Sequence, residues 1–265
     1  MSLNAWGGRL ADALLPYLAA VRPDVLCLQE VTCTPGAAGD WLVYRDGELA
    51  LPQRANLLDE VGTVLPEHAA MFCPAAQGAL WDGAVPLASR FGLATFVHRD
   101  LAVIGQAQGF VHGRYAADGY GPHPRPRNAH VVRLHDPRTG VPVTVAQLHG
   151  LRDPVAGKRD TPERLAQAQR LKALVEAVAQ PGDRLVVCGD FNVEPDSATF
   201  EILGTLGLRD LVTGRGHAGT RTSHYAKPGK FADYMLVGAD LAEAPFEVVR
   251  APEVSDHCPL LLSLG

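Results

Sequence analysis

The segment that most constrains this chain is a run of four apolar residues at positions 185–188, which ends in Gly189. A short apolar run stopped by glycine is typical of a buried strand that ends at a turn. Asp190 and Asn192 follow at once and project to one side of the chain, while Phe191 projects to the other. The sequence therefore predicts a sheet that presents a carboxylate and a carboxamide together at its edge.

Other polar residues stand at or near apolar runs in the same way. Glu30 follows the run 25–28, His149 follows the run 143–148, and the others are Asn4, Asp233, and Asp256 with His257. Each one alone has an ordinary explanation as a turn residue, a solvated carboxylate or a core histidine with both nitrogens bonded. Acidic and imidazole groups at the ends of buried strands are unfavourable unless they have partners, and these groups complement one another. We therefore expect them to meet at one site.

The rest of the chain alternates helices with short strands. Helical spacing of apolar residues predicts a helix over 10–21, kinked or divided by Pro16, and another over 57–65. A start signal at 160–163, with a capping residue, proline and Glu163, opens a third helix. This alternation predicts a single α/β domain over residues 1–265.

Hairpins and loops are predicted between these helices. Apolar runs separated by turns indicate two hairpins, one pairing 129–134 with 143–148 and the other pairing 93–97 with 101–104. Glycine and proline predict loops over 73–86 and 109–127. The second loop is long enough to cover a binding site.

Composition narrows the class of protein. The net charge of −5 opposes broad electrostatic attraction to a polyanion, so tight binding to duplex nucleic acid is not favoured. Five cysteines without close pairing predict reduced, buried thiols rather than disulfides or a zinc site. No apolar run reaches the length of a membrane span, and no signal-peptide pattern is present. We expect a cytoplasmic monomer.

The polar residues named above occur in short motifs whose order resembles the endonuclease/exonuclease/phosphatase superfamily. The motifs are Asn4 in SLNAW, Glu30 in DVLCLQEV, Asp190 and Asn192 in GDFNVEP, Asp233 in FADYMLV, and Asp256 with His257 in SDHCPL. Each motif alone is weakly specific, but the full ordered set over nearly the whole chain is highly specific. The resemblance implies a layered α/β sandwich of two mixed β-sheets packed face to face, with helices on the outside.

The resemblance also implies a Mg²⁺-dependent phosphodiester hydrolase, in which Mn²⁺ can replace Mg²⁺. Such a cation neutralises the charge that grows on phosphorus during attack by water, and it prefers oxygen ligands. By this resemblance Glu30 is the leading ligand, supported by Asn4 and Asp256. The resemblance further implies that Arg127 and Asn128 contact the phosphate.

Catalytic roles follow from the same resemblance. Asp190 orients or deprotonates the attacking water, and Asn192 holds that water or a phosphoryl oxygen. His257, oriented by Asp233, is either a protonated stabiliser of the phosphate or the general base. His149 resembles the second histidine of the deoxyribonuclease and sphingomyelinase branches, where it protonates the leaving oxygen.

Several substrates and two other functions remain open at this point. The phosphodiester can be single-stranded nucleic acid, a phospholipid head group, an inositol phosphate or a nucleotide-like small molecule. A phosphomonoesterase acting on a small substrate and a catalytically inactive binding protein with the same fold are the alternatives. The loop residues Tyr115, Tyr120 and Arg125 either stack on an unpaired nucleotide or form an ordinary cover.

Overall fold

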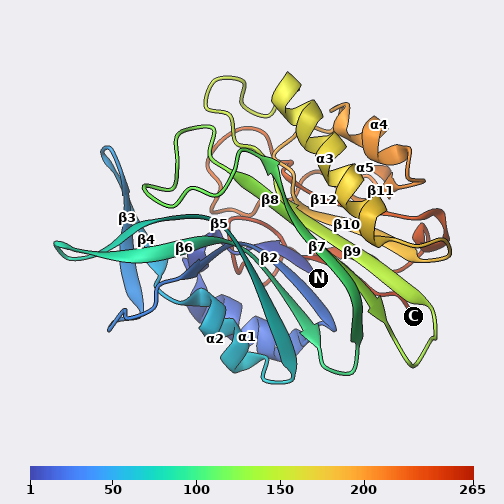
Figure 1. The fold of residues 1–265 in the computed structure, drawn as a ribbon, viewed down its shortest axis with the longest axis horizontal. Coiled ribbons are helices and arrows are strands. Elements are labelled where there is room, and N and C mark those ends of the chain that lie inside the picture. Colours follow the sequence, from blue (N-terminus) through green and yellow to red (C-terminus); the bar gives the residue numbers. More distant parts are fainter.

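The structure is a computed structural model that describes residues 1–265. Two β-sheets pack face to face, with helices on their outer sides (Figure 1). Sheet A has the strand order β13, β14, β1, β2, β6, β5, β3, β4, and sheet B has the order β11, β12, β10, β9, β8, β7. The predicted layered sandwich of two mixed sheets is confirmed.

The strands of each sheet come from distant parts of the chain. Sheet A contains β1 (Ser2–Asn4), β2 (Val25–Cys33), β3 (Trp41–Asp46), β4 (Leu49–Arg54), β5 (His68–Asp82), β6 (Val85–His98), β13 (Phe246–Val248) and β14 (Leu260–Leu262). Sheet B contains β7 (Ala102–His112), β8 (Arg127–His135), β9 (Pro142–His149), β10 (Arg184–Asp190), β11 (Arg209–Asp210) and β12 (Asp233–Val237). Both sheets mix parallel and antiparallel pairs. The two ends of the chain meet in sheet A, where β1 pairs with β14.

The three predicted helices form where their signals stand, as α1 (Ala11–Val21), α2 (Leu57–Val64) and α3 (Pro162–Val178). The structure adds two short helices that were not predicted, α4 (Thr199–Gly204) and α5 (Leu211–Gly214), and short 3-10 turns at Trp6–Gly8 and Ala239–Leu241. Thr161 caps α3 by accepting the backbone N–H of Arg164 at 3.3 Å, and Pro162 is its first residue. α1 is not divided at Pro16, although this proline lies in the middle of the helix and cannot donate a backbone hydrogen bond.

Two local predictions are wrong. Residues 93–97 and 101–104 do not pair as a hairpin, because β6 lies in sheet A and β7 crosses to the edge of sheet B. Residues 73–86 are not a loop, because β5 and β6 pair over nearly their whole length. Gly78 is a strand residue whose Cβ would overlap the ring of Tyr120, so this glycine permits a close approach rather than a turn.

A buried polar network joins the facing surfaces of the two sheets. Gln147 of β9 donates to the carbonyl oxygen of Ala94 at 2.9 Å and to Thr95 Oγ1 at 2.8 Å, and it accepts a hydrogen bond from Gln29 Nε2 at 2.9 Å. Thr95 Oγ1 also bonds to Nδ1 of His130 at 2.7 Å. These bonds satisfy polar groups between the sheets and fix how sheet B sits on sheet A.

The remaining global features agree with the sequence. All five cysteines are free and buried. None of the helices combines the length and the apolar character needed to cross a membrane.

We predict that Gln147→Leu lowers the free energy of unfolding by about 2 kcal/mol or more, because its buried partners lose their hydrogen bonds while the side-chain volume is kept. Urea unfolding followed by circular dichroism measures this change. Gln108→Leu is the control, because Gln108 is exposed on the edge strand β7. Equal stability of the two variants would show that the network does not hold the sheets together.

Candidate active site

Strand register places three of the predicted residues side by side. β9 and β10 are parallel and pair Asp190 with His149, whereas β12 runs antiparallel to β10 and pairs Asp190 with Asp233. His149, Asp190 and Asp233 therefore form one row across the edge of sheet B. Gly189 makes this pairing possible, since it has a φ of 132° and any side chain there would overlap the carbonyl oxygen of Leu148.

Sheet A contributes Asn4 and Glu30 from the facing edge. β2 does not end at Glu30, as the sequence suggested, but continues after a bulge between Leu28 and Val31. Glu30 has a φ of 59°, a backbone conformation that is uncommon for residues other than glycine. Bulges of this kind re-aim a side chain beside active sites, and here the carboxylate meets sheet B.

Asn4 connects the acidic residues of the two sheets. Its Nδ2 donates to Glu30 Oε1 at 3.2 Å and to Asp190 Oδ2 at 2.9 Å. Its Oδ1 accepts the backbone N–H of Trp6 at 2.9 Å, and its own carbonyl oxygen accepts the hydroxyl of Ser255 at 2.7 Å. The carboxamide is thus held in one orientation by groups that are far apart in sequence.

His257 and Asp233 form a buried pair. Nδ1 of His257 lies 2.8 Å from both carboxylate oxygens of Asp233, and Thr220 Oγ1 donates to Asp233 Oδ2 at 2.8 Å. Nε2 of His257 lies 3.8 Å from Asp190 Oδ2. Asp233 therefore keeps the proton of the neutral imidazole on Nδ1. The unprotonated Nε2 faces the row of sheet B residues.

The protonation state of His257 follows from its surroundings. Burial, and next the Arg221 cation, lower the pKa of His257 to about 4, so the imidazole is neutral at pH 7. The contact between Arg221 Nη1 and Nε2 agrees, because Nε2 must accept there. Of the two roles left open for His257, this state favours the general base over the protonated stabiliser.

The carboxylates of Glu30 and Asp256 carry charge that the protein does not fully compensate. Burial, and next the Asp256 carboxylate, raise the pKa of Glu30 to about 7. Oδ2 of Asp256 accepts from Arg221 at 2.9 Å, but Oδ1 is buried without a hydrogen-bond partner. A buried oxygen without a donor beside a second acid suits a hard divalent cation, which binds carboxylate and amide oxygens.

A second acidic grouping is less suited to an ion. Ligand atoms of Asp190, Asp233 and His257 lie within 4.8 Å of one another. The Asp233 carboxylate, however, already bonds His257 and Thr220. The residues that fit a cation are therefore Glu30 and Asp256, with Asn4 beside them.

His149 on β9 and Arg127 on β8 lie on the side of Asp190 away from Asp233, because β9 and β12 flank β10. Nε2 of His149 is 3.8 Å from Glu30 Oε1 and 3.8 Å from Asp190 Oδ2. Burial, and next the Arg127 cation, hold the pKa of His149 well below its ordinary value. Burial also lowers the pKa of Arg127 to about 10, so its guanidinium stays charged at pH 7 and contributes positive charge near Glu30 and Asp190.

Asn192 and Asn128 differ in their placement. The backbone N–H of Asn192 donates to Asp190 Oδ1 at 3.0 Å, and its side chain reaches the carbonyl oxygen of Gly150 at 3.3 Å. Asn128 instead donates to the carbonyl oxygen of Cys73 at 2.8 Å, between the two sheets. The structure brings Asn192 to the acidic residues, whereas the side chain of Asn128 joins the two sheets. The phosphate contact predicted for Asn128 stays a prediction.

Two cations of the site were not found from the sequence. Arg221 pairs with Asp256 at 2.9 Å and stacks on the ring of Tyr225 at 4.2 Å. Lys158 bonds the carbonyl oxygen of Phe231, and burial followed by the Arg221 cation lowers its pKa. Both lie on loops without a motif or periodic pattern, so the sequence offers no signal for them.

The loop predicted over 109–127 begins later, because β7 continues to His112. Tyr120 is buried beside Tyr44 and Phe91, and Arg125 pairs with Asp46 at 2.9 Å. These contacts attach the loop to sheet A, so of the two roles left open for Tyr120 and Arg125 the structure favours a packed cover.

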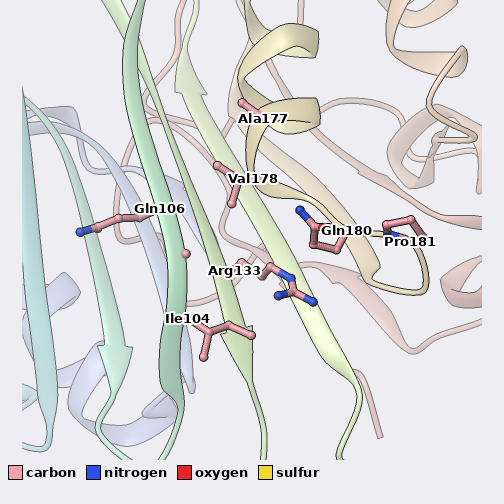
Figure 2. Close-up of a pocket in the computed structure, with 8 residues that line it drawn as sticks. Ile104, Gln106, Arg133, Ala177, Val178, Gln180 and Pro181 are labelled. Carbon is pink, nitrogen blue, oxygen red and sulfur yellow. The ribbon is translucent and has the colours of Figure 1, made fainter.

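A hollow of about 600 Å³ lies away from these residues, on the outer face of sheet B beneath the end of α3 (Figure 2). Arg133 projects into it, but its guanidinium is already bonded to Asp183 at 2.8 Å. The hollow lacks a free catalytic group.

Comparison with known proteins identifies the class. The chain matches the Endonuclease/Exonuclease/phosphatase family over residues 1–257 and belongs to that family. It is 25% identical over 218 residues to an inositol phosphosphingolipids phospholipase C of Schizosaccharomyces pombe, covering 78% of this chain and 44% of that protein. The chain therefore spans under half the length of this curated relative.

Solved structures share the fold at low identity. A mannosyl-6-phosphatase of Bacteroides thetaiotaomicron is 16% identical, covers 99% of this chain and 98% of its own, and has a TM-score of 0.63. TDP2 of D. rerio, complexed with single strand DNA product, is 15% identical, with coverages of 98% and 96% and a TM-score of 0.61. Members of the family hydrolyse phosphoesters, generally with a divalent metal, and these relatives act on different substrates.

We predict that His257→Ala lowers kcat for a phosphoester by about two orders of magnitude or more, because one preorganised catalytic group is lost. Steady-state kinetics measure the loss, and circular dichroism checks the fold. His135→Ala is the control. His135 is the last residue of β8, whereas Arg127, which lies near the site, is the first. Near-normal turnover of the His257 variant would remove this residue from the mechanism.

Proposed function

We propose that this protein is a divalent-cation-dependent phosphodiesterase, with Mg²⁺ as the natural cation. The observation that carries the proposal is that two pairs of residues with different chemistry meet in one site. Glu30 and Asp256 are an acidic pair with an unpartnered oxygen, and His257 is a neutral imidazole bonded to Asp233. The acidic pair suits a cation, and the imidazole can accept a proton.

Glu30 and Asp256 would hold the cation, which supplies charge neutralisation for the phosphate. Asn4 does not fit the ligand role predicted for it, because its Nδ2 faces Glu30 while its Oδ1 is bonded to the backbone N–H of Trp6. It would orient Glu30 instead.

The protein adds two cations of its own nearby, Arg127 and Arg221. Both are charged at pH 7: Arg127 lies near Glu30 and Asp190, and Arg221 pairs with Asp256. A phosphoester bound among them would draw Arg221 from His257 Nε2 towards its oxygens and leave that nitrogen free to accept a proton.

Attack then follows from the positions of Asp190 and His257. Oδ2 of Asp190 and Nε2 of His257 are 3.8 Å apart, so one water can bond to both. The water oxygen forms a bond to phosphorus while its proton moves to Nε2, and the Asp233 carboxylate stabilises the imidazolium. Asn192 positions Asp190 through its backbone N–H.

The leaving oxygen receives its proton from His149. In the substrate-free protein this imidazole is held neutral by burial and by Arg127. The negative charge of a bound phosphoester favours its protonated form, because an opposite charge nearby raises the pKa of an imidazole. The P–O bond to the leaving group breaks as the oxygen takes this proton, so two histidines on opposite sides serve as base and acid.

Removal of the acid that binds the cation tests the first half of this proposal. We predict that millimolar Mg²⁺ raises the melting temperature of the wild-type protein, since a cation that binds only the folded state stabilises it. Glu30→Gln should lose most of this shift and most of the activity, whereas Glu243→Gln, an exposed control, should keep both. Differential scanning fluorimetry with and without EDTA measures the shift, and an equal shift in all three proteins would place the cation elsewhere.

The ester preference is tested with matched chromogenic substrates. We predict faster hydrolysis of bis(p-nitrophenyl) phosphate than of p-nitrophenyl phosphate, and loss of both activities with EDTA. Both esters release the same leaving group, but the diester carries a single negative charge and the monoester about two at pH 7, so the crowded carboxylates of the site repel the monoester more. A reversed preference would indicate a phosphomonoesterase, and no hydrolysis of either ester with Mg²⁺ or Mn²⁺ would indicate a binding protein.

A further inference from the structure

A groove beside Asn4 has no role in the proposed chemistry. Its volume is about 350 Å³, near the lower end for ligand pockets, so it suits one small ring rather than a large ligand. Its walls come from the 3-10 turn after β1, from the β3–β4 hairpin and from the loop before β12, and the lining residues are Trp6, Arg9, Leu10, Trp41, Pro52 and His224.

Two of the residues that line the groove are neighbours in the chain of residues at the candidate active site. The backbone N–H of Trp6 donates to Asn4 Oδ1 at 2.9 Å, and two residues of chain separate their Cα atoms by at most about 8 Å. On the other wall, His224 lies three residues after Arg221, which pairs with Asp256. The groove therefore lies close enough to the site to receive an ester substituent of a phosphate bound there.

The aromatic walls are held in place without a ligand. The guanidinium of Arg9 stacks on the ring of Trp6 at 4.0 Å, and Arg54 lies over the ring of Trp41 at 4.9 Å. Trp6 has a φ of 53°, which is strained for a bulky residue, and such strain is concentrated at functional sites. The Trp41 side chain is 42% exposed, so a face of this indole is open to a ligand.

We propose that this groove binds a nucleobase carried on one ester of the substrate, which makes nucleotidyl phosphodiesters the preferred substrate class. This inference rests on the proposed phosphodiesterase function. Indole faces with nearby cations stack on any base. A sugar or inositol ring would need acceptors for the protons of many hydroxyl groups, but the lining contains no carboxylate or amide side chain.

Two diesters with the same leaving group test the inference. Thymidine 5′-(p-nitrophenyl phosphate) carries a nucleoside as its second ester, and methyl p-nitrophenyl phosphate carries only a methyl group. Wild-type protein should show a higher kcat/KM for the nucleoside ester. Trp41→Ala should lower the ratio of the two kcat/KM values by about fivefold or more, the effect expected when base stacking is lost. Trp41→Phe should recover most of the ratio.

Trp81→Ala is the matched control. Trp81 also lies on sheet A, where Arg45 stacks on its ring at 4.7 Å, but it does not line the groove. This variant should keep the wild-type ratio. An unchanged ratio in Trp41→Ala would overturn the inference, as would an equal or larger loss for the p-nitrophenyl diester of inositol, which would assign the groove to a hydroxylated ring.

Binding without turnover separates this inference from the proposed function. Thymidine 5′-monophosphate, added in the presence of EDTA, should quench tryptophan fluorescence, and Trp41→Ala should weaken its apparent affinity by about fivefold or more. Inorganic phosphate is the comparison ligand and should not distinguish the two proteins. If neither diester is hydrolysed but this binding difference is present, the phosphodiesterase proposal fails while the base-binding groove stands. If the binding difference is absent, the groove assignment fails.

Discussion

The crowding of acids where the two sheets meet is the constraint on which the site depends. Glu30 from sheet A and Asp190 from sheet B both contact the single carboxamide of Asn4. Asp256 adds a third carboxylate, which Arg221 compensates on one oxygen only. Burial and the neighbouring Asp256 carboxylate raise the pKa of Glu30 to about 7. The fold therefore gathers acids whose mutual repulsion is relieved by nearby arginines, by protonation of Glu30, or by a cation of the kind proposed above.

The site and the groove have different structural origins. Strand ends place Asn4, His149, Asp190 and Asp233, because their register ties each residue to its neighbour. The groove is formed by a 3-10 turn, a hairpin and a loop. Loops and hairpins vary more readily than paired strands, so recognition of the substrate can change while the reacting groups stay fixed.

Sequence reasoning succeeded where a continuous apolar run ends in a polar residue. It identified the strand before Asp190 and the helix that begins after Thr161. It failed for β5 and β6, because Gly78 belongs to a strand and makes room for Tyr120. It also ended β2 at Glu30, because a bulge with positive φ is decided by the pairing of β2 with β6 rather than by local sequence.

The sequence by itself determined the residue types of the site and their order along the chain, since each motif joins an apolar strand to one acid, amide or imidazole. Only the tertiary structure decided which of them touch. Arg221 and Lys158 became part of the site through loop positions that no periodic pattern encodes. Asn128 was directed to Cys73 because the two sheets face each other at that point. Contacts between strands far apart in sequence depend on register and sheet packing, and neither is written in the residues near each motif.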